Sequence, residues 1–265
     1  MVLLDPSRRS IAVSPTSTLP AIAQRSEDIG IRSRKTDCAT CHVRQLCLPM
    51  ELPSDALVEF GALVSRQTRY RKGDSLYRPG EPFTALYAIR IGSCKTTVLA
   101  EDGREQICGY HMLGDIIGLD GIGAECYACE AVTLEDTEVC ALPFDRLEAL
   151  ARKSPLLQHT LHRYLSAGIG RRQNAMLALG SLRAEERLAW FLLNLSDRYR
   201  QRGYSSTVFV LRMTRQDIGS YLGLKLETIS RLFSRLQAAG VLQTQGRVVK
   251  LLDLSALKTL AGHHC

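Results

Sequence analysis

The chain has 265 residues, 45% of them hydrophobic, which is enough for two modest domains with packed cores and a connector. Its net charge of +7 favours a polyanionic partner. It has no apolar run of about 18 residues and no secretory start, so we expect a cytoplasmic protein with no membrane contact. The nine cysteines are an odd number without an export signal, which favours metal ligands or redox groups over a disulfide framework.

The N-terminal stretch changes character twice. Residues 1–34 mix Ser, Pro and Arg without any period, which predicts a disordered arm. Residues 35–50 then hold a group of cysteines. Residues 51–68 have apolar side chains at helical spacing, with Ser54 or Asp55 expected as the N-cap. These apolar side chains are Leu57, Phe60, Leu63 and Val64.

The next stretch, residues 70–144, is typical of β structure. Short runs rich in β-branched residues, such as LYAIRIG, KTTVLA, REQICGY and EVCALPF, are separated by Gly and Asp turns. Their spacing of about 8–12 residues predicts an antiparallel sandwich or roll. We therefore assign residues 35–150 to a cysteine loop and a β domain.

Helical periodicity returns at residues 145–180, and we assign residues 151–182 to one long helix. Its apolar stripe includes Leu161, Leu165, Ile169 and Met176, interrupted by Arg171 and Arg172. The stripe could pack on the β domain of its own chain or pair with a second copy. We favour a homodimer seam, because proteins with the DNA-reading element described next usually work as pairs.

The C-terminal domain, residues 183–260, contains the pattern of a helix-turn-helix. A helix over residues 184–203 precedes it, and residues 215–234 read RQDIGSYLGLKLETISRLFS. Gly219 is the small residue needed where two helices cross, and Gly223 permits the positive φ of the turn. Thr214 is the expected N-cap of the first helix. The apolar residues that lock the two helices together are Ile218, Leu222, Leu224, Ile229 and Leu232.

One face of the second helix is suited to reading DNA bases. Glu227, Ser230 and Arg231 share that face near the N-terminal end of the helix. Arg can bond a guanine, Glu can accept a hydrogen bond from a cytosine amine, and Ser can serve several bases. Two short strands around Gly246 follow and form a basic wing. The alternative is an ordinary helical hairpin with a solvated charged face.

The first cysteine group has the sequence Cys38-x2-Cys41-x5-Cys47. A short loop can wrap three thiolates around a soft metal or a cluster, and a fourth ligand must come from elsewhere or from His42. Spacing alone leaves zinc and iron–sulfur equally open.

The other cysteines divide into pairs and single residues. Cys126 and Cys129 form a second CxxC pair, which we interpret as two small loop residues. Cys94 and Cys108 fall in strand-like runs and are expected to be buried small hydrophobes.

Together these residues resemble the FNR (fumarate and nitrate reduction regulator) branch of the cyclic-AMP receptor protein superfamily. The resemblance runs over residues 35–262, through CATCHVRQLCLP, GREQICGYHMLGDIIGLDGIG, EVCALPF and AEERLAWFLLNLS, and through MTRQDIGSYLGLKLETISRLFSRLQAAG. It implies an α+β fold with an N-terminal β-roll sensor domain, a long dimerisation helix and a C-terminal winged helix-turn-helix. It also implies a transcription regulator, not an enzyme, that reads TTGAT-type half-sites as a homodimer through Glu227, Ser230 and Arg231.

The resemblance further implies an oxygen-labile [4Fe-4S] cluster held by Cys38, Cys41, Cys47 and Cys140. It implies RNA polymerase as a partner, and we take the loop Glu101–Glu105 as a candidate contact. Two positions depart from the pattern of the relatives. Arg172 stands where the best-known relatives have an acidic residue. Cys126-Tyr127 stands where cyclic-nucleotide binders have an Arg-Ser pair, so no cyclic nucleotide is expected.

Other functions were weighed against this one. A winged-helix regulator with a structural zinc and a different signal is the main alternative. A thiol–disulfide enzyme using CxxC is disfavoured, because no thioredoxin-like βαβ pattern surrounds either pair. A regulator gated by a cyclic nucleotide is also disfavoured, because this chain has no cationic residue at the position that would bind the nucleotide phosphate.

Overall fold

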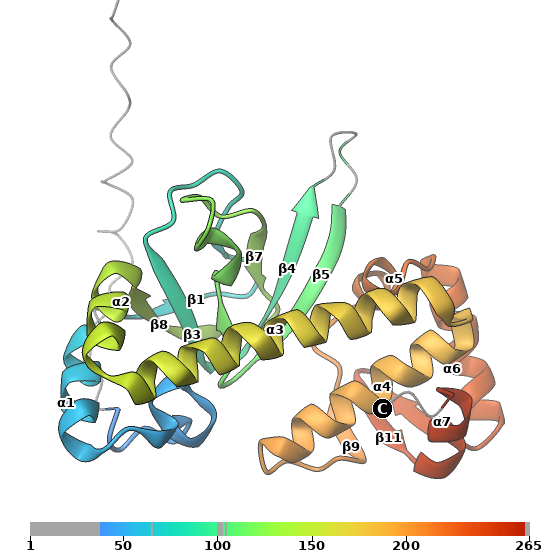
Figure 1. Ribbon diagram of the computed structural model, residues 1–265. Helices are drawn as coiled ribbons and strands as arrows, with labels where there is room; N and C mark the ends of the chain where they lie inside the picture. The colour runs from blue at the N-terminus through green and yellow to red at the C-terminus, as the bar shows by residue number, and fades with distance from the viewer. Residues whose placement is uncertain (1–37, 65, 100–102, 104, 263–265) are drawn as a thin grey trace, which may run out of the picture. The chain divides into compact units, whose positions relative to one another are not determined.

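A computed structural model describes residues 38–64, 66–99, 103 and 105–262 (Figure 1). The described residues all fall within one compact unit. The predicted arm over residues 1–34, Cys265 and positions 101, 102 and 104 of the proposed polymerase loop lie outside them. No helix in the described part of the chain is long and apolar enough to cross a membrane.

The cysteine segment consists of short turns followed by one helix. The 3-10 turns η2 (Arg44–Leu46) and η3 (Leu48–Glu51) lead into α1 (Ser54–Leu63). Leu57, Phe60 and Leu63 are buried on α1 as their spacing predicts. The expected cap was wrong: Pro53 occupies the N-cap position and no side chain caps the helix. Pro53 sets the extended entry to the helix with its fixed φ.

The predicted β domain is confirmed as antiparallel sheets (Figure 1). One sheet has the order β1-β8-β3-β6, formed by Arg66–Tyr70, Thr137–Pro143, Ala85–Ile91 and Ile116–Ile117. Another has the order β2-β7-β4-β5, formed by Ser75–Tyr77, Glu130–Thr133, Ser93–Leu99 and Glu105–Met112. Apolar side chains from both sheets, among them Leu86, Ile89, Ile107 and Val139, are buried.

A β-bulge interrupts the pairing of β4 with β5. Thr96 pairs with Gly109, whereas Thr97 pairs with Ile107, so Cys108 is the extra residue between them. A bulge shifts the phase of side-chain alternation. Ile107 and Tyr110, three residues apart, are therefore both buried, and Cys108 is exposed.

The helical stretch after the roll is divided in two. The helix α2 (Phe144–Lys153) ends at Ser154, and α3 (Pro155–Ser181), yellow in Figure 1, begins at the next residue. A residue that precedes proline is disfavoured in the α region, and Ser154 is extended. The Ser154 hydroxyl accepts a hydrogen bond from the Leu157 amide and so caps α3.

The C-terminal domain has the predicted order of elements plus one more helix. It runs α4 (Ala184–Gln201), β9 (Val208–Val210), α5 (Arg215–Leu222), α6 (Leu226–Ala238), β10 (Leu242–Gln245), β11 (Val248–Leu251) and α7 (Leu254–Leu260). The helix α7 was not predicted. Its side chain Leu257 is fully buried in the core of this domain.

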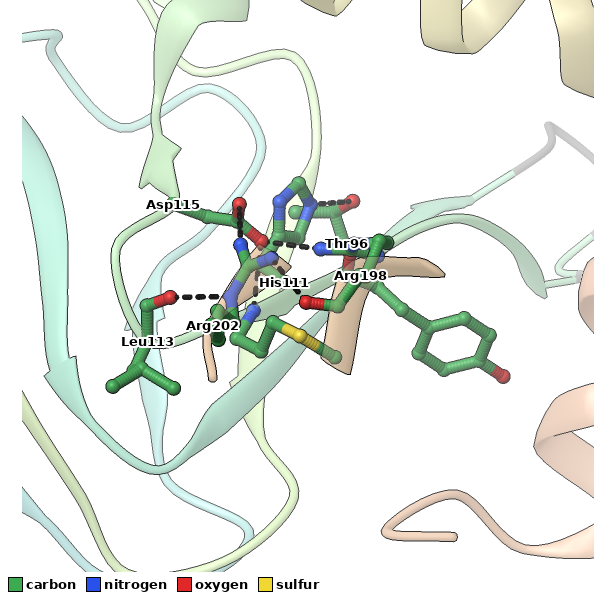
Figure 2. Close-up of polar contacts among 8 residues, drawn as sticks. Thr96, His111, Leu113, Asp115, Arg198 and Arg202 are labelled. Atoms are coloured by element: carbon green, nitrogen blue, oxygen red, sulfur yellow. Dashed lines mark hydrogen bonds and ion pairs between the residues drawn. The ribbon is translucent and has the colours of Figure 1, made fainter. Parts of the chain in front are cut away.

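A buried carboxylate joins the roll to α4 (Figure 2). Asp115 follows β5 and forms ion pairs with Arg198 and Arg202 of α4, and the Asp115–Arg202 contact is 2.7 Å long. Both arginines also donate to main-chain carbonyls of the roll, at Tyr110 and Leu113 respectively. Burial alone would raise the pKa of Asp115, but the two guanidiniums outweigh it and hold that pKa below its usual value.

Candidate functional site

The helix-turn-helix has the local geometry that its sequence predicts. The Thr214 hydroxyl accepts a hydrogen bond from the Asp217 amide, and the Asp217 carboxylate accepts one from the Thr214 amide, forming a capping box. A Cβ added at Gly219 would lie 2.6 Å from the Leu224 carbonyl oxygen, so only glycine permits this crossing. Gly223 adopts φ 63° at the turn. These contacts hold α5 and α6 together in one fixed unit.

The predicted base-reading residues are all exposed on α6. Glu227, Ser230 and Arg231 face solvent, while Ile229 and Leu232 on the opposite side are buried against α5. The wing, formed by β10, β11 and the turn between them, carries Arg247 and Lys250, both exposed. The exposed face of α6 is therefore polar and charged, while its apolar face packs against α5.

Sequence reasoning missed the role of Arg215 in this domain. Its guanidinium lies over the ring of Phe233, 3.2 Å from the centroid, as a cation–π contact. Burial lowers the pKa of Arg215 to about 10. The sequence analysis gave Arg215 no role of its own, because a contact between residues 18 positions apart leaves no local signal.

The four cysteines singled out by the family resemblance line one small cavity. Cys38, Cys41 and Cys47 come from the loop before α1, and Cys140 comes from β8, where it pairs with Ala88 of β3. The cavity measures about 20 Å³ and its remaining walls are largely apolar. The structure thus gathers four thiols that are separated by as many as 102 positions in sequence.

The thiols of this group raise one another's pKa. Burial raises the pKa of Cys140 to about 12, with the neighbouring Cys38 and Cys41 adding to the effect. Burial also raises the pKa of Cys47, and Cys140 contributes next. Four thiolates this close repel one another in an apolar site, so deprotonating them together requires a cation or a cationic cluster.

The residue types of this cavity admit more than one group. The described residues contain no set of three or more His, Cys, Asp or Glu side chains already placed to hold a metal ion. Four cysteine thiolates are a ligand set of structural zinc and also of iron–sulfur clusters.

The cysteine loop is attached to the start of α3. The Tyr164 hydroxyl donates a hydrogen bond to the Leu46 carbonyl, and Arg163 forms a 2.7 Å ion pair with Glu51. Leu157 and Leu161 of α3 pack in the same apolar cluster as Cys38, Leu48 and Cys140. The loop and the helix therefore share one core.

The predicted dimer residues have different environments along α3. Leu161 is 8% exposed because it packs on its own chain, and Leu165 is half-buried. Ile169 is 57% exposed and Met176 is 71% exposed. Apart from Leu156 in its first turn, the large apolar side chains that α3 leaves exposed lie in its second half.

The remaining cysteines confirm one prediction and contradict another. Cys94 is fully buried on β4, as expected. Cys108 is exposed, so the expectation of a buried side chain was wrong, because the bulge in β5 turns this residue outward. Cys126 is half-buried, and Cys129 is buried beside Asp120. Tyr127 stacks on Tyr77 with ring centroids 4.0 Å apart in the core of the roll.

Comparisons with known proteins agree with this architecture. Residues 186–260 match the model of the Crp-like helix-turn-helix domain, and residues 67–154 match that of the cyclic nucleotide-binding domain. The transcriptional activator protein Anr of Pseudomonas aeruginosa is 40% identical over 89% of this chain and 98% of its own length. The fumarate and nitrate reduction regulatory protein of Escherichia coli is 42% identical over 85% and 90%. The structure of FixK2 from Bradyrhizobium japonicum matches with a TM-score of 0.68 at 32% identity, over 73% of this chain and 96% of that one.

Proposed function

Because the chain belongs to the FNR family of the cyclic-AMP receptor protein superfamily and is a DNA-binding transcription regulator, we propose that it regulates transcription in response to oxygen. Its signal would be a [4Fe-4S] cluster, its DNA targets palindromic TTGAT-type sites, and its active form a homodimer that contacts RNA polymerase. The observation that carries the proposal is the convergence of Cys38, Cys41, Cys47 and Cys140 on one cavity.

The donor set of this cavity fits an iron–sulfur cluster. Four cysteine thiols meet there, and cysteine thiolates are the ligands that such clusters take. When bound, the cluster would supply a group that oxygen destroys. Arg90 forms an ion pair with Glu138 and lines the cavity, so it places a cation beside the thiols. Membership of the FNR family favours a cluster over the structural zinc that the sequence left open.

The chain's own residues connect this cavity to the DNA-reading domain through α3. At the start of the helix, Tyr164 and Arg163 contact the cysteine loop. Near its end, Ala178 is buried in the core of the winged domain, and Leu179 lies at the Gly223 turn. We infer that a loop held against α3 supports the helix in its pairing position, and that a released loop withdraws both contacts. This is a population shift biased by a cofactor.

Pairing through the second half of α3 would present two copies of α6 to DNA. Ile169 and Met176 lie seven residues apart on the uncovered face, the repeat of a two-helix seam. Two recognition helices about one DNA turn apart, roughly 34 Å, would then read the two half-sites. Glu227, Ser230 and Arg231 would supply the base contacts.

The first experiment is anaerobic purification of the full chain, with an absorbance spectrum and iron and sulfide assays before and after air. We expect about four irons and four sulfides per chain, with bleaching in air. A matched pair of variants tests the ligands, because Cys140→Ser and Cys94→Ser both change a buried strand cysteine. Only Cys140→Ser should lose iron. A colourless protein with one zinc, unchanged by air, would contradict the oxygen response and leave the DNA-binding regulator standing.

The dimer is tested separately by sedimentation of the anaerobic protein. Met176→Glu places a charge on the uncovered face of α3 and should shift the protein to monomer without loss of iron. Lys153→Glu, at the exposed end of α2, is the control. If Met176→Glu remains dimeric, the seam lies elsewhere.

A further inference from the structure

The first helix of the helix-turn-helix, α5, lies against the outer edge of a sheet of the roll. The strand β5 is the last in the order β2-β7-β4-β5, so one of its edges has no strand partner in that sheet. The Ile107 amide of β5 donates a 3.0 Å hydrogen bond to the Ser220 hydroxyl of α5, and that hydroxyl lies 3.4 Å from the Glu105 carbonyl. The Gln106 side chain donates to the Ser220 carbonyl. The helix α5 therefore covers main-chain groups that an edge strand otherwise leaves open.

A partly buried ion pair fastens the N-terminal end of the same helix to the roll. The Lys95 Nζ of β4 lies 2.7 Å from the Asp217 Oδ1, and the two side chains are 22% and 13% exposed. The other carboxylate oxygen, Oδ2, accepts hydrogen bonds from the amide and the hydroxyl of Thr214 in the capping box. Burial alone would raise the pKa of Asp217, but the hydrogen bonds from Lys95 and Thr214 hold it below its usual value. The carboxylate that caps α5 is therefore also bound to β4.

Apolar side chains extend this attachment. Tyr110 of β5 meets Tyr221 of α5 edge to face, with ring centroids 5.1 Å apart. Ile107 and Tyr110 are buried in the same apolar cluster as Ile218 of α5. The edge of β5 and the first helix of the helix-turn-helix therefore share one core.

The attachment leaves the DNA-reading face of α6 uncovered. Glu227, Ser230 and Arg231 are exposed, and the contacts of α5 with β4 and β5 involve none of them. The docking of α5 therefore does not block DNA. It fixes the direction in which α6 points from the roll, because the close crossing at Gly219 holds α5 and α6 as one unit.

The winged domain is thus attached to the roll at two separate helices. One is α4, through the ion pairs of Arg198 and Arg202 with Asp115, and the other is α5. A domain that is attached at one place can rotate about it, whereas a second attachment away from the first removes that freedom. The attachment at α5 is the one that adjoins the recognition helix.

We propose that the edge of β5 is a docking site that sets the direction of α6, and that Lys95 and Ser220 are positioning residues for binding two half-sites at one fixed spacing. This inference rests on the proposed homodimer. Each copy carries its recognition helix on its own roll, so the separation of the two helices depends on where α5 docks as well as on the α3 seam. Released from β5, each α6 would still read one half-site but would accept pairs at several spacings.

The test measures affinity for duplexes whose two TTGAT-type half-sites differ in spacer length, and for a single half-site. The anaerobic wild-type chain should prefer one spacer length. Ser220→Ala and Lys95→Met should each reduce the affinity ratio between that spacer and the next about tenfold, the effect of losing hydrogen bonds of these kinds. Affinity for the single half-site should not change. Lys95→Arg keeps the charge and should retain the preference, and Lys72→Met, at an exposed position of the roll, is the control.

Hydrogen exchange of the same proteins measures the docking without DNA. The Ile107 amide should exchange faster in Ser220→Ala than in the wild type, while the amides of α6 keep their rates. A spacing preference that persists in both variants would overturn the proposal, as would equal losses of affinity for paired and single half-sites. A wild-type chain without any spacing preference would contradict the proposed dimer and the role in spacing together. The two failures are distinguishable, because only the second is seen in the wild type.

Discussion

The Tyr164 hydroxyl of α3 donates a hydrogen bond to the main-chain carbonyl of Leu46, which immediately precedes Cys47 in the cysteine loop. Gly114 of the roll packs against Leu46 from the other side. The approach is so close that a Cβ added at Gly114 would lie 2.5 Å from the Leu46 Cβ. The loop that carries three of the four thiols is thus fixed between the roll and the helix. Any change in how the loop closes on its cavity reaches α3 at this point.

Removing this hydrogen bond should separate cofactor binding from dimerisation. A hydrogen bond of this kind contributes about 1 kcal/mol, so Tyr164→Phe should weaken the dimer about fivefold. Iron content should not change, because Tyr164 is not one of the proposed cluster ligands. Sedimentation of the anaerobic protein measures the effect, with Tyr204→Phe at an exposed position as control. Unchanged dimerisation would mean that the loop acts through other contacts.

Base contacts and phosphate contacts should differ in their response to sequence and salt. Arg231→Ala should cost about 1–3 kcal/mol on a TTGAT-type duplex and relax preference at one base position. Lys250→Ala, on the wing, should weaken binding to all duplexes alike and reduce the salt slope by about 1. Titrations against matched and altered duplexes at several salt concentrations distinguish the two. If Arg231→Ala lowers the affinity for all duplexes equally, Arg231 contacts the DNA phosphate backbone and not a base.

His111 should make the protein less stable as the solution is acidified. Burial lowers the pKa of His111 to about 4, whereas the unfolded chain has the usual value near 6.5. Between these values the unfolded state binds more protons, so the free energy of unfolding falls with falling pH, by about 2 kcal/mol from pH 7 to pH 5. Urea unfolding at both values measures this. His111→Gln should reduce the dependence, and His162→Gln, at an exposed position of α3, should not.

The helix crossing at Gly219 should tolerate no side chain. Gly219→Ala pushes a methyl group against the Leu224 carbonyl and should destabilise the winged domain by about 1–3 kcal/mol. Gly180→Ala is the contrast, since nothing lies within 4 Å of its added Cβ in α3. That change should be neutral or stabilise by up to about 1 kcal/mol. Thermal unfolding of the two variants side by side decides the point.

The parts of the molecule that the sequence predicted are those set by neighbouring residues. The Thr214 cap, the Gly223 turn and the strand runs all depend on patterns within about ten positions. The break at Ser154 also had a local signal, the proline that follows it. The convergence of Cys140 with Cys38 depends instead on the register of β8 against β1 and β3, which no short pattern encodes. It was reached only through the family resemblance.

The errors have physical causes of the same kind. Cys108 was expected inside because its run alternates like a regular strand, and a single extra residue in β5 reverses its direction. The ion pairs of Asp115 with Arg198 and Arg202 join residues that lie more than 80 positions apart in the sequence. In the sequence alone, these three residues cannot be told from ordinary surface charges.

The length of α3 has a mechanical consequence. Its 27 residues span about 40 Å as one uninterrupted rod. Tyr164, about a third of the way along, is held at the cysteine loop, while Leu179 touches the helix-turn-helix near the C-terminal end. A tilt of about 5° at Tyr164 would move Leu179, about 22 Å farther along the helix, by roughly 2 Å. In the proposed mechanism the rod would act as a lever, because a small tilt beside the thiols would become a displacement that is large on the scale of a hydrogen bond to a DNA base.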